Sequence, residues 1–200
     1  MAGADIPRRL SREARRLQLV EVAMSLAAEE GFSTLSLDKV ADRSGVTRNL
    51  LYHYFPRGLQ DLVVAVADEA GRRLADEWVT DETISREERL AANFARTVDH
   101  AYGPSDEWRV YRQSRTYAYD EARQTSDAYV ERVVSAIALN NAGTSEPPPL
   151  MRMAIHGFLA YAETALEEAR DAGLDREPVL TILAQTLVAT VAAAQDAQVL

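Results

Sequence analysis

The sequence of 200 residues contains no cysteine, which excludes disulfide bonds, thiolate metal sites and cysteine nucleophiles. It has no run of about eighteen apolar residues, so no transmembrane helix is expected. The N-terminal stretch MAGADIPRRLSREARR is polar and rich in arginine, without the apolar core of a secretory signal. These absences predict a soluble cytoplasmic protein that has no membrane partner.

Signatures of catalysis are also missing. The sequence contains no G-x-S-x-G elbow, no phosphate-binding loop and no H-E-x-x-H motif, and no G-x-G-x-x-G follows a strand pattern. His100 and His156 are isolated, without the spacing of metal ligands. We therefore expect no enzymatic activity, no catalytic residue, no metal site and no cofactor.

Charge is distributed unevenly along the chain, whose formal net charge is −9. The first sixty residues hold nine basic and seven acidic side chains, a net charge of +2, which leaves −11 for the rest. The basic groups include an arginine-rich arm between Arg8 and Arg16. A basic head can approach nucleic acid, whereas phosphate would repel the acidic remainder.

Hydrophobic residues recur at the helical period in every long segment, and no strand-like alternation persists. This pattern predicts an all-α fold. Glycine and proline mark the breaks between segments, most clearly in the loop of residues 140–149. The predicted helices span about 11–30, 37–44, 48–55, 59–79, 86–101, 105–118, 121–140, 150–171 and 177–196.

Residues 31–55, GFSTLSLDKVADRSGVTRNLLYHYF, have the pattern of a helix-turn-helix. Ser36 and Thr47 are suitable N-caps for two short helices. Between these helices Gly45 can adopt a positive φ and Val46 can fill the angle. The start of the second helix is where such motifs contact base edges and phosphate.

The same segment resembles the DNA-binding domain of TetR-family regulators from about Arg16 to Ala67. The resemblance rests on matching residues without gaps between Gly31 and Pro56: Glu30-Gly31-Phe32, Ser36, Val40-Ala41, Gly45-Val46-Thr47, Leu51-Tyr52 and Tyr54-Phe55-Pro56. It implies a three-helix DNA-binding domain in residues 1–58 and a helical ligand-binding and dimerisation domain in residues 59–200.

The resemblance also implies roles for individual residues. Ser36 and Thr47 would contact phosphate, and Tyr52 would contact backbone or bases. Leu50 stands where the family often has threonine, so a thymine methyl is its expected contact. The family usually has a lysine after Phe55-Pro56, and Arg57 is expected to replace its phosphate contact. The complete set of expected DNA contacts is Ser36, Thr47, Arg48, Asn49, Leu50, Tyr52, His53 and Arg57.

A ligand site is predicted where aromatic and basic residues are densest: Trp108, Tyr111, Arg112, Arg115 and Tyr117. Ordinary core packing of these rings is the alternative. Glu163, Glu167 and Glu168 are expected on a solvated face. The last two helices are too apolar for the outside of a monomer, which predicts a homodimer formed through them.

These inferences predict a transcriptional repressor that binds double-stranded DNA as a homodimer, at an operator with twofold symmetry. A small-molecule inducer in the C-terminal domain would release it. One alternative is a regulator without such an inducer, controlled by a protein or acting as an activator. A second is a helical enzyme or adaptor whose head only resembles the motif.

Overall fold

The structure, a computed structural model, describes residues 10–78, 81, 83–116 and 120–197. Within these residues it contains nine α-helices, one short 3-10 helix and no strand, which confirms the all-α prediction. The elements are α1 (Arg12–Glu30), η1 (Phe32–Thr34), α2 (Leu37–Ser44), α3 (Arg48–Tyr54), α4 (Leu59–Asp76), α5 (Arg86–Tyr102), α6 (Asp106–Ser114), α7 (Asp120–Ala142), α8 (Pro149–Asp171) and α9 (Arg176–Asp196).

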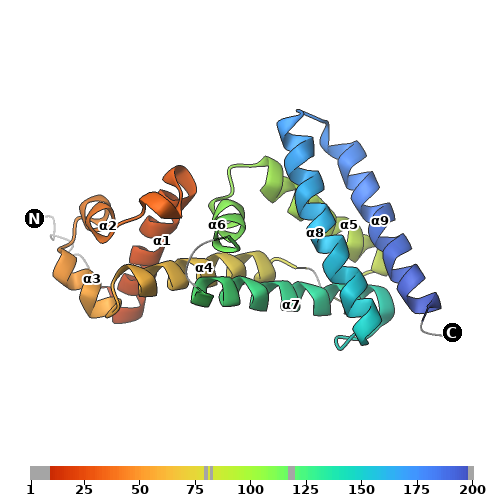
Figure 1. Ribbon diagram of the computed structural model, residues 1–200, viewed down its shortest axis with the longest axis horizontal. Helices are drawn as coiled ribbons and strands as arrows, with labels where there is room; N and C mark the ends of the chain where they lie inside the picture. The colour runs from red at the N-terminus through yellow and green to blue at the C-terminus, as the bar shows by residue number, and fades with distance from the viewer. Residues whose placement is uncertain (1–9, 79–80, 82, 117–119, 198–200) are drawn as a thin grey trace, which may run out of the picture.

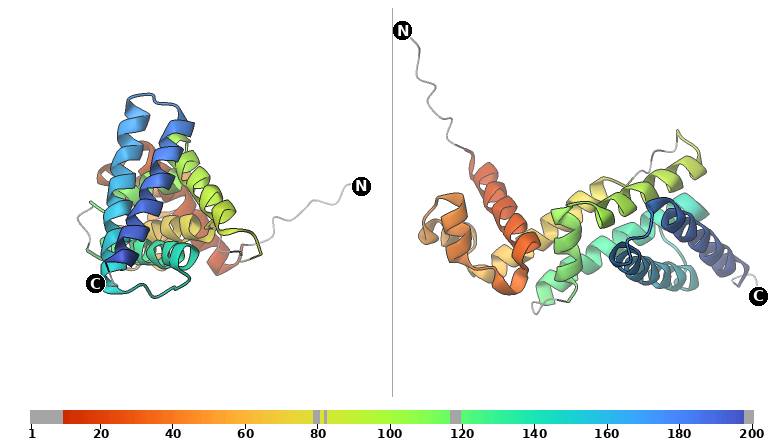
Figure 2. Two further views of the ribbon diagram at one scale, coloured as in Figure 1. Left: turned by 90° about the vertical axis from the view of Figure 1, so that its right-hand side faces the viewer. Right: turned by 90° about the horizontal axis from the view of Figure 1, so that it is seen from above.

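The helices form an elongated molecule (Figure 1). Helices α1, α2 and α3, which we call the head, lie at one end. Helix α4 runs from the head into the middle of the molecule beside α7. Helices α5 to α9, which we call the body, form the rest, and α8 and α9 lie side by side at the end remote from the head (Figure 2).

The described residues form two hydrophobic cores along this length. The head core joins α1, α2 and α3 to α4 through residues such as Leu19, Val40 and Leu62, all of them fully buried. The body core joins α5 to α9 around residues such as Ile155 and Leu183. Helix α6 belongs to both cores, since its Val110 packs in the head and its Trp108 and Tyr111 pack in the body. A displacement of α6 would therefore disturb both cores.

Short-range signals account for the positions of most helix ends. Ser85 begins α5 with a capping box, in which Glu88 accepts a bond from the Ser85 N–H. Pro149 begins α8 at the first helical position, where its missing N–H costs nothing. Two predicted helices are too long: α4 ends at Asp76 and α6 at Ser114.

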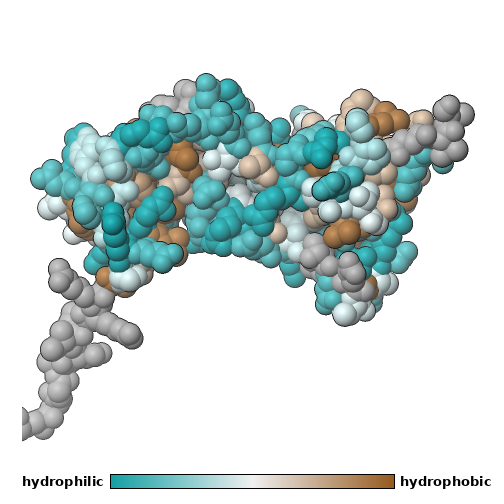
Figure 3. Space-filling view, turned by 90° about the horizontal axis from the view of Figure 1, so that it is seen from below, coloured by the Kyte–Doolittle hydropathy of each residue, from teal (hydrophilic) through white to brown (hydrophobic). Residues whose placement is uncertain are grey.

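The end formed by α8 and α9 exposes large hydrophobic side chains. Met153 and Ile182 are 63% and 54% exposed, and Tyr161 and Val188 are also exposed. Helix α9 is long and apolar enough to cross a membrane, with a mean hydropathy of 1.5 over a window that is 28% buried. On the side of the molecule shown in Figure 3, by contrast, hydrophobic residues form separate spots among hydrophilic ones. Exposed large hydrophobic side chains are therefore a feature of both α8 and α9.

Candidate nucleic-acid interface

Two side-chain caps begin the helices of the helix-turn-helix. The Ser36 hydroxyl accepts a hydrogen bond from the Lys39 N–H at 3.3 Å and caps α2. The Thr47 hydroxyl accepts one from the Leu50 N–H at 3.3 Å and caps α3. Each cap satisfies one of the N–H groups that a helix leaves unpaired at its start. Both caps agree with the sequence-based prediction.

The turn between α2 and α3 depends on a glycine. Gly45 has φ 67° and ψ 30°, the left-handed conformation that glycine adopts without steric cost. Its N–H donates to the Asp42 carbonyl, and the Val46 N–H donates to the Ala41 carbonyl at 3.0 Å. These two hydrogen bonds end α2 and fix the direction of α3 relative to α2.

Helix α3 presents a polar face to solvent. Thr47, Arg48, Asn49 and His53 are exposed, whereas Leu50 is half-buried. The buried Leu51 anchors the opposite side of the helix in the head core. The expected DNA contacts on α3 therefore lie on one accessible surface, with Leu50 at its edge.

Arg48, the first residue of α3, is held by two neighbours. Its Nη1 donates to both carboxylate oxygens of Asp38, on α2, at 3.1 Å. Its Nη2 donates to the Tyr52 hydroxyl at 3.4 Å, and the guanidinium lies 5.8 Å from the centre of the Tyr52 ring. The bond to Tyr52, and next the charge of Asp38, raise the pKa of Arg48 above its usual value. The side chain is thus oriented although it is exposed.

Tyr52 owes its position to the turn that follows α3. A Cβ on Gly58 would lie 3.1 Å from Cε1 of the Tyr52 ring and 3.4 Å from a methyl of Leu37. Gly58 has φ 67° and ψ −125°, a conformation that residues with a side chain rarely adopt. The absence of a side chain at residue 58 lets the ring lie against the backbone, with its hydroxyl beside Arg48.

Ion pairs attach the rest of α2 to the end of α1. Nζ of Lys39 lies 2.6 Å from Oε2 of Glu30, and Nη2 of Arg43 lies 3.1 Å from Oε2 of Glu29. All four side chains are well exposed, so each pair adds little to stability. Their effect is on charge, because Lys39 and Arg43, like Arg48, already have acidic partners.

Arg57 is also paired. Its Nε lies 2.6 Å from Asp61, and its two terminal nitrogens lie 2.8 Å from the Glu121 carboxylate at the start of α7. The hydrogen bonds from Arg57 hold the pKa of Glu121 below its usual value. Arg57 therefore connects the end of the head to the body, with both of its terminal nitrogens bonded to Glu121. Its expected phosphate contact remains a prediction.

The predicted ligand residues separate into two groups. Trp108 and Tyr111 are buried and lie at a partly open apolar cavity of about 50 Å³, which Trp78 and Tyr129 also line. A second apolar cavity, of about 40 Å³, lies among α5, α7, α8 and α9. Each is far smaller than the several hundred Å³ of a usual ligand pocket. Tyr117 lies outside the described residues.

The two arginines of this group bind a carboxylate. Arg112 and Arg115 donate to Glu163 on α8 at 2.8 and 2.5 Å, and the Tyr111 hydroxyl donates to it at 2.7 Å. Glu163 is only 13% exposed, so its expected place on a solvated face was wrong. Sequence reasoning missed this network because its members lie about fifty residues apart.

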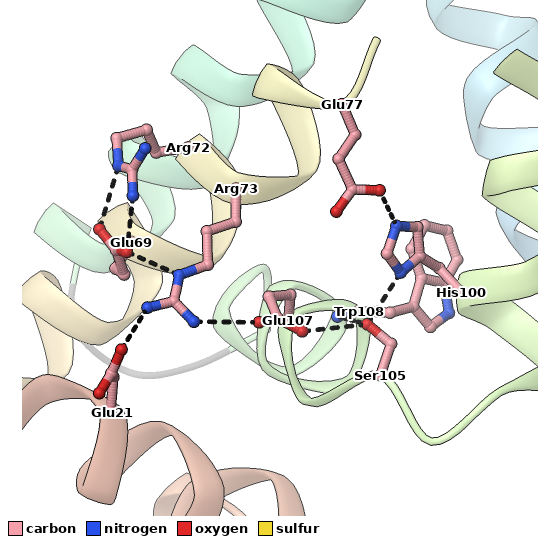
Figure 4. Close-up of polar contacts among 9 residues, drawn as sticks. All are labelled: Glu21, Glu69, Arg72, Arg73, Glu77, His100, Ser105, Glu107 and Trp108. Atoms are coloured by element: carbon pink, nitrogen blue, oxygen red, sulfur yellow. Dashed lines mark hydrogen bonds and ion pairs between the residues drawn. The ribbon is translucent and has the colours of Figure 1, made fainter.

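A chain of polar contacts runs from the head through α6 into the body (Figure 4). Arg73, on α4, binds Glu21 of α1 at 2.9 Å and Glu107 of α6 at 3.3 Å. Glu107 also accepts a bond from Ser105, which bonds to His100 of α5 at 3.0 Å. These contacts, like Val110, tie α6 to the head and body together.

Helix α6 also touches the head next to the helix-turn-helix. The Gln113 side-chain oxygen accepts a hydrogen bond from the Phe32 N–H at 3.0 Å. Phe32 is buried in the head core, directly before the segment that leads into α2. Helix α6, which carries Trp108 and Tyr111, therefore contacts the head through both Val110 and Gln113.

Comparisons with known proteins agree with this architecture. Residues 19–66 match the model of a family described as bacterial regulatory proteins, tetR family. The chain is similar to a tetR-family transcriptional regulator from Streptomyces coelicolor, with a TM-score of 0.77 and 24% identity over 92% of this chain and 83% of that one.

Two further crystal structures share the fold. A TetR transcriptional regulator from Legionella pneumophila has a TM-score of 0.70 and 16% identity, over 90% of this chain and 98% of that one. The transcriptional regulator FadR from Bacillus subtilis, in complex with stearoyl-CoA, has a TM-score of 0.65 and 18% identity, over 87% and 98%. The family resemblance inferred from residues 16–67 is confirmed.

Proposed function

We propose that this chain, which carries the N-terminal segment of the TetR family on the fold of that family's regulators, is a sequence-specific transcriptional repressor of the cytoplasm. The observation that carries the proposal is the exposed polar face of α3, which begins at a capped and accessible helix N-terminus. Such a terminus binds phosphate, and its first side chains reach base edges in the major groove. Residues 1–58 would form the DNA-binding domain, and residues 59–200 the regulatory domain.

Selection of bound sequences from random double-stranded DNA tests this function directly. The proposal expects one enriched sequence with twofold symmetry. Failure to enrich any sequence would leave the helical enzyme or adaptor as the better account.

Point variants then locate the contact surface. Thr47→Ala and Tyr52→Ala should weaken binding while the protein stays folded, and each should lower the log–log salt slope by about one unit if a phosphate contact is lost. Thr83→Ala makes the same change as Thr47→Ala at an exposed position between α4 and α5, and it should leave binding unchanged. Wild-type affinity in both head variants would contradict the assignment.

A homodimer formed through α8 and α9 would satisfy two requirements. It would cover the exposed apolar residues at the end remote from the head. It would also place two heads on one DNA, as an operator with twofold symmetry needs. Membrane insertion of α9 is the competing explanation for the apolar surface. Association with lipid vesicles in place of a stable dimer would favour it.

The proposal includes release from DNA by a small molecule in the body. Its support is the placement of Trp108 and Tyr111 at a cavity beside α6, the helix that contacts both cores. The cavity of about 50 Å³ must enlarge to hold a metabolite, so the bound and free states would differ in the position of α6. A ligand acts only through such a difference in affinity between states.

Stearoyl-CoA is a suitable first probe, because the similar FadR structure contains it. Fluorescence of a Trp78→Phe variant reports binding near Trp108. Gln113→Ala, which removes the bond to Phe32, should bind ligand normally but release DNA less completely. Gln124→Ala, at an exposed site on α7, is the matched control.

A regulator that senses no small molecule is the second candidate, as a protein-controlled regulator or an activator. The small size of the two apolar cavities, about 40 and 50 Å³, favours it. Operator binding that no metabolite in a broad panel reduces would support this candidate.

A further inference from the structure

The contact between Asp38 and Arg48 joins an acidic residue of α2 to the first residue of α3. An acidic side chain in a DNA-facing motif is electrostatically unfavourable, because its negative charge repels phosphate. Both side chains are more than half exposed, so the pair adds little to stability. Its geometry is nevertheless specific, with Nη1 of Arg48 3.1 Å from each carboxylate oxygen.

Some N–H donors of Arg48 bond to neighbouring side chains, and others are available to a ligand. A guanidinium has five N–H donors. Asp38 accepts from Nη1 and the Tyr52 hydroxyl accepts from Nη2, while the Tyr52 ring lies beneath the group. The Nε–H and one Nη2–H have no partner among the described residues. A bidentate contact to O6 and N7 of guanine needs two such donors.

We propose that Asp38 is a positioning residue that holds Arg48 for bidentate recognition of a guanine, and so sets sequence preference at one base pair of each half-site. The inference rests on the proposed DNA-binding function. Asp38 and Tyr52 fix a long, flexible side chain before DNA arrives, which lowers the entropy lost on binding. Asp38 itself contacts no DNA in this scheme.

The ratio of affinities for different bases at one position distinguishes two effects of Asp38: orientation of Arg48 and simple charge repulsion of DNA. Removing an acidic charge near DNA raises affinity for every sequence by a similar factor. Losing the orientation of Arg48 lowers discrimination at one base pair and leaves the others unchanged. A good bidentate contact discriminates roughly 5- to 150-fold against the wrong base. Asp38→Ala should therefore reduce the preference at that position by about tenfold.

The experiment measures affinities of the full-length protein for the selected sequence and for its single-base variants. Arg48→Ala identifies the base pair that Arg48 reads. Asp42→Ala is the matched control, because Asp42 is exposed on the same helix and its side chain has no partner among the described residues. It removes the same charge and should leave discrimination at that base pair unchanged. Thermal melting checks that every variant is folded.

A double variant completes the test. If Asp38 acts through Arg48, Asp38→Ala has no further effect on discrimination in the Arg48→Ala background. An equal effect in both backgrounds would overturn the inference and indicate a direct contact of Asp38 with a base. A uniform gain in affinity with an unchanged base profile would also overturn it. All of these outcomes require that the wild-type protein prefers one DNA sequence. If the wild type has no preferred sequence, the proposed function has failed, and the role of Asp38 is not what the result contradicts.

Discussion

The hydroxyl of Tyr111 provides a test of whether the Glu163 network stabilises the body. Tyr111 is 3% exposed, and its hydroxyl donates to Glu163 at 2.7 Å. Burial, and next the charge of Glu163, raise the pKa of Tyr111 well above its usual value, so the hydroxyl remains a donor throughout the neutral range. Tyr111→Phe removes this bond together with the longer one, of 3.3 Å, that the hydroxyl accepts from Arg115, and it keeps the ring contacts.

The expected loss follows from the charge of the acceptor. A hydrogen bond to a charged group contributes about 1.5–3 kcal/mol. Arg112 and Arg115 still bind Glu163 in the variant, and the cavity of about 50 Å³ beside Tyr111 has room for a water molecule. Both factors favour the lower end, about 1.5–2 kcal/mol. For a domain of this size that lowers Tm by roughly 3–8 °C.

Tyr102 offers the same substitution with the opposite expectation. Its hydroxyl is buried and has no hydrogen-bond partner among the described residues. Removing an unsatisfied buried hydroxyl relieves a desolvation cost, so Tyr102→Phe should be neutral or stabilising. Calorimetry of both variants at one protein concentration measures the difference. Equal Tm values for the wild type and Tyr111→Phe, or a comparable loss in Tyr102→Phe, would refute the reasoning.

Three further predictions concern the turn, the response to pH and the assembly. Gly58→Ala should cost about 1–3 kcal/mol in chemical denaturation, because φ 67° strains any side chain there; wild-type stability would contradict this. Burial raises the pKa of Glu69, but bonds from Arg72 and Arg73 outweigh it and hold that pKa below its usual value. The contribution of Glu69 to the free energy of unfolding is therefore present above about pH 4.5 and is lost as the pH falls further. A series of melting curves should show that Glu69→Gln loses less stability than the wild type below that pH. Light scattering should give a particle mass of about twice the chain mass of 22.1 kDa. Ile182→Glu on α9 should halve the particle mass, whereas Leu17→Glu, at an exposed site on α1, should leave it unchanged. An unchanged mass for Ile182→Glu would argue against the α8–α9 interface.

The head was predictable because its signals are local. Ser36 and Thr47 each bond to an N–H three residues away, and Gly45 ends α2 through its own backbone conformation. Hydrophobic periodicity over ten to twenty residues placed the helices, since each buries one face. Helix ends were less secure where no cap signal was recognised, as at the ends of α4 and α6.

Side-chain partners were beyond the reach of such signals. Glu163 was expected on a solvated face together with Glu167 and Glu168, yet α6 brings two arginines and Tyr111 against it. Arg57 was expected to contact phosphate from its place after Phe55 and Pro56. Its partner Glu121 is 64 residues away, and no pattern in the sequence connects them.

The sequence by itself determined the helices, the turn at Gly45 and the family of the head, because caps, periodicity and backbone preferences act within a few residues. Tertiary structure decided which charges are neutralised, how large the cavities beside Trp108 are, and that α6 contacts both cores. Those properties depend on how helices distant in sequence pack together. A side chain such as Arg48 acquires its orientation only when α2 places Asp38 beside it.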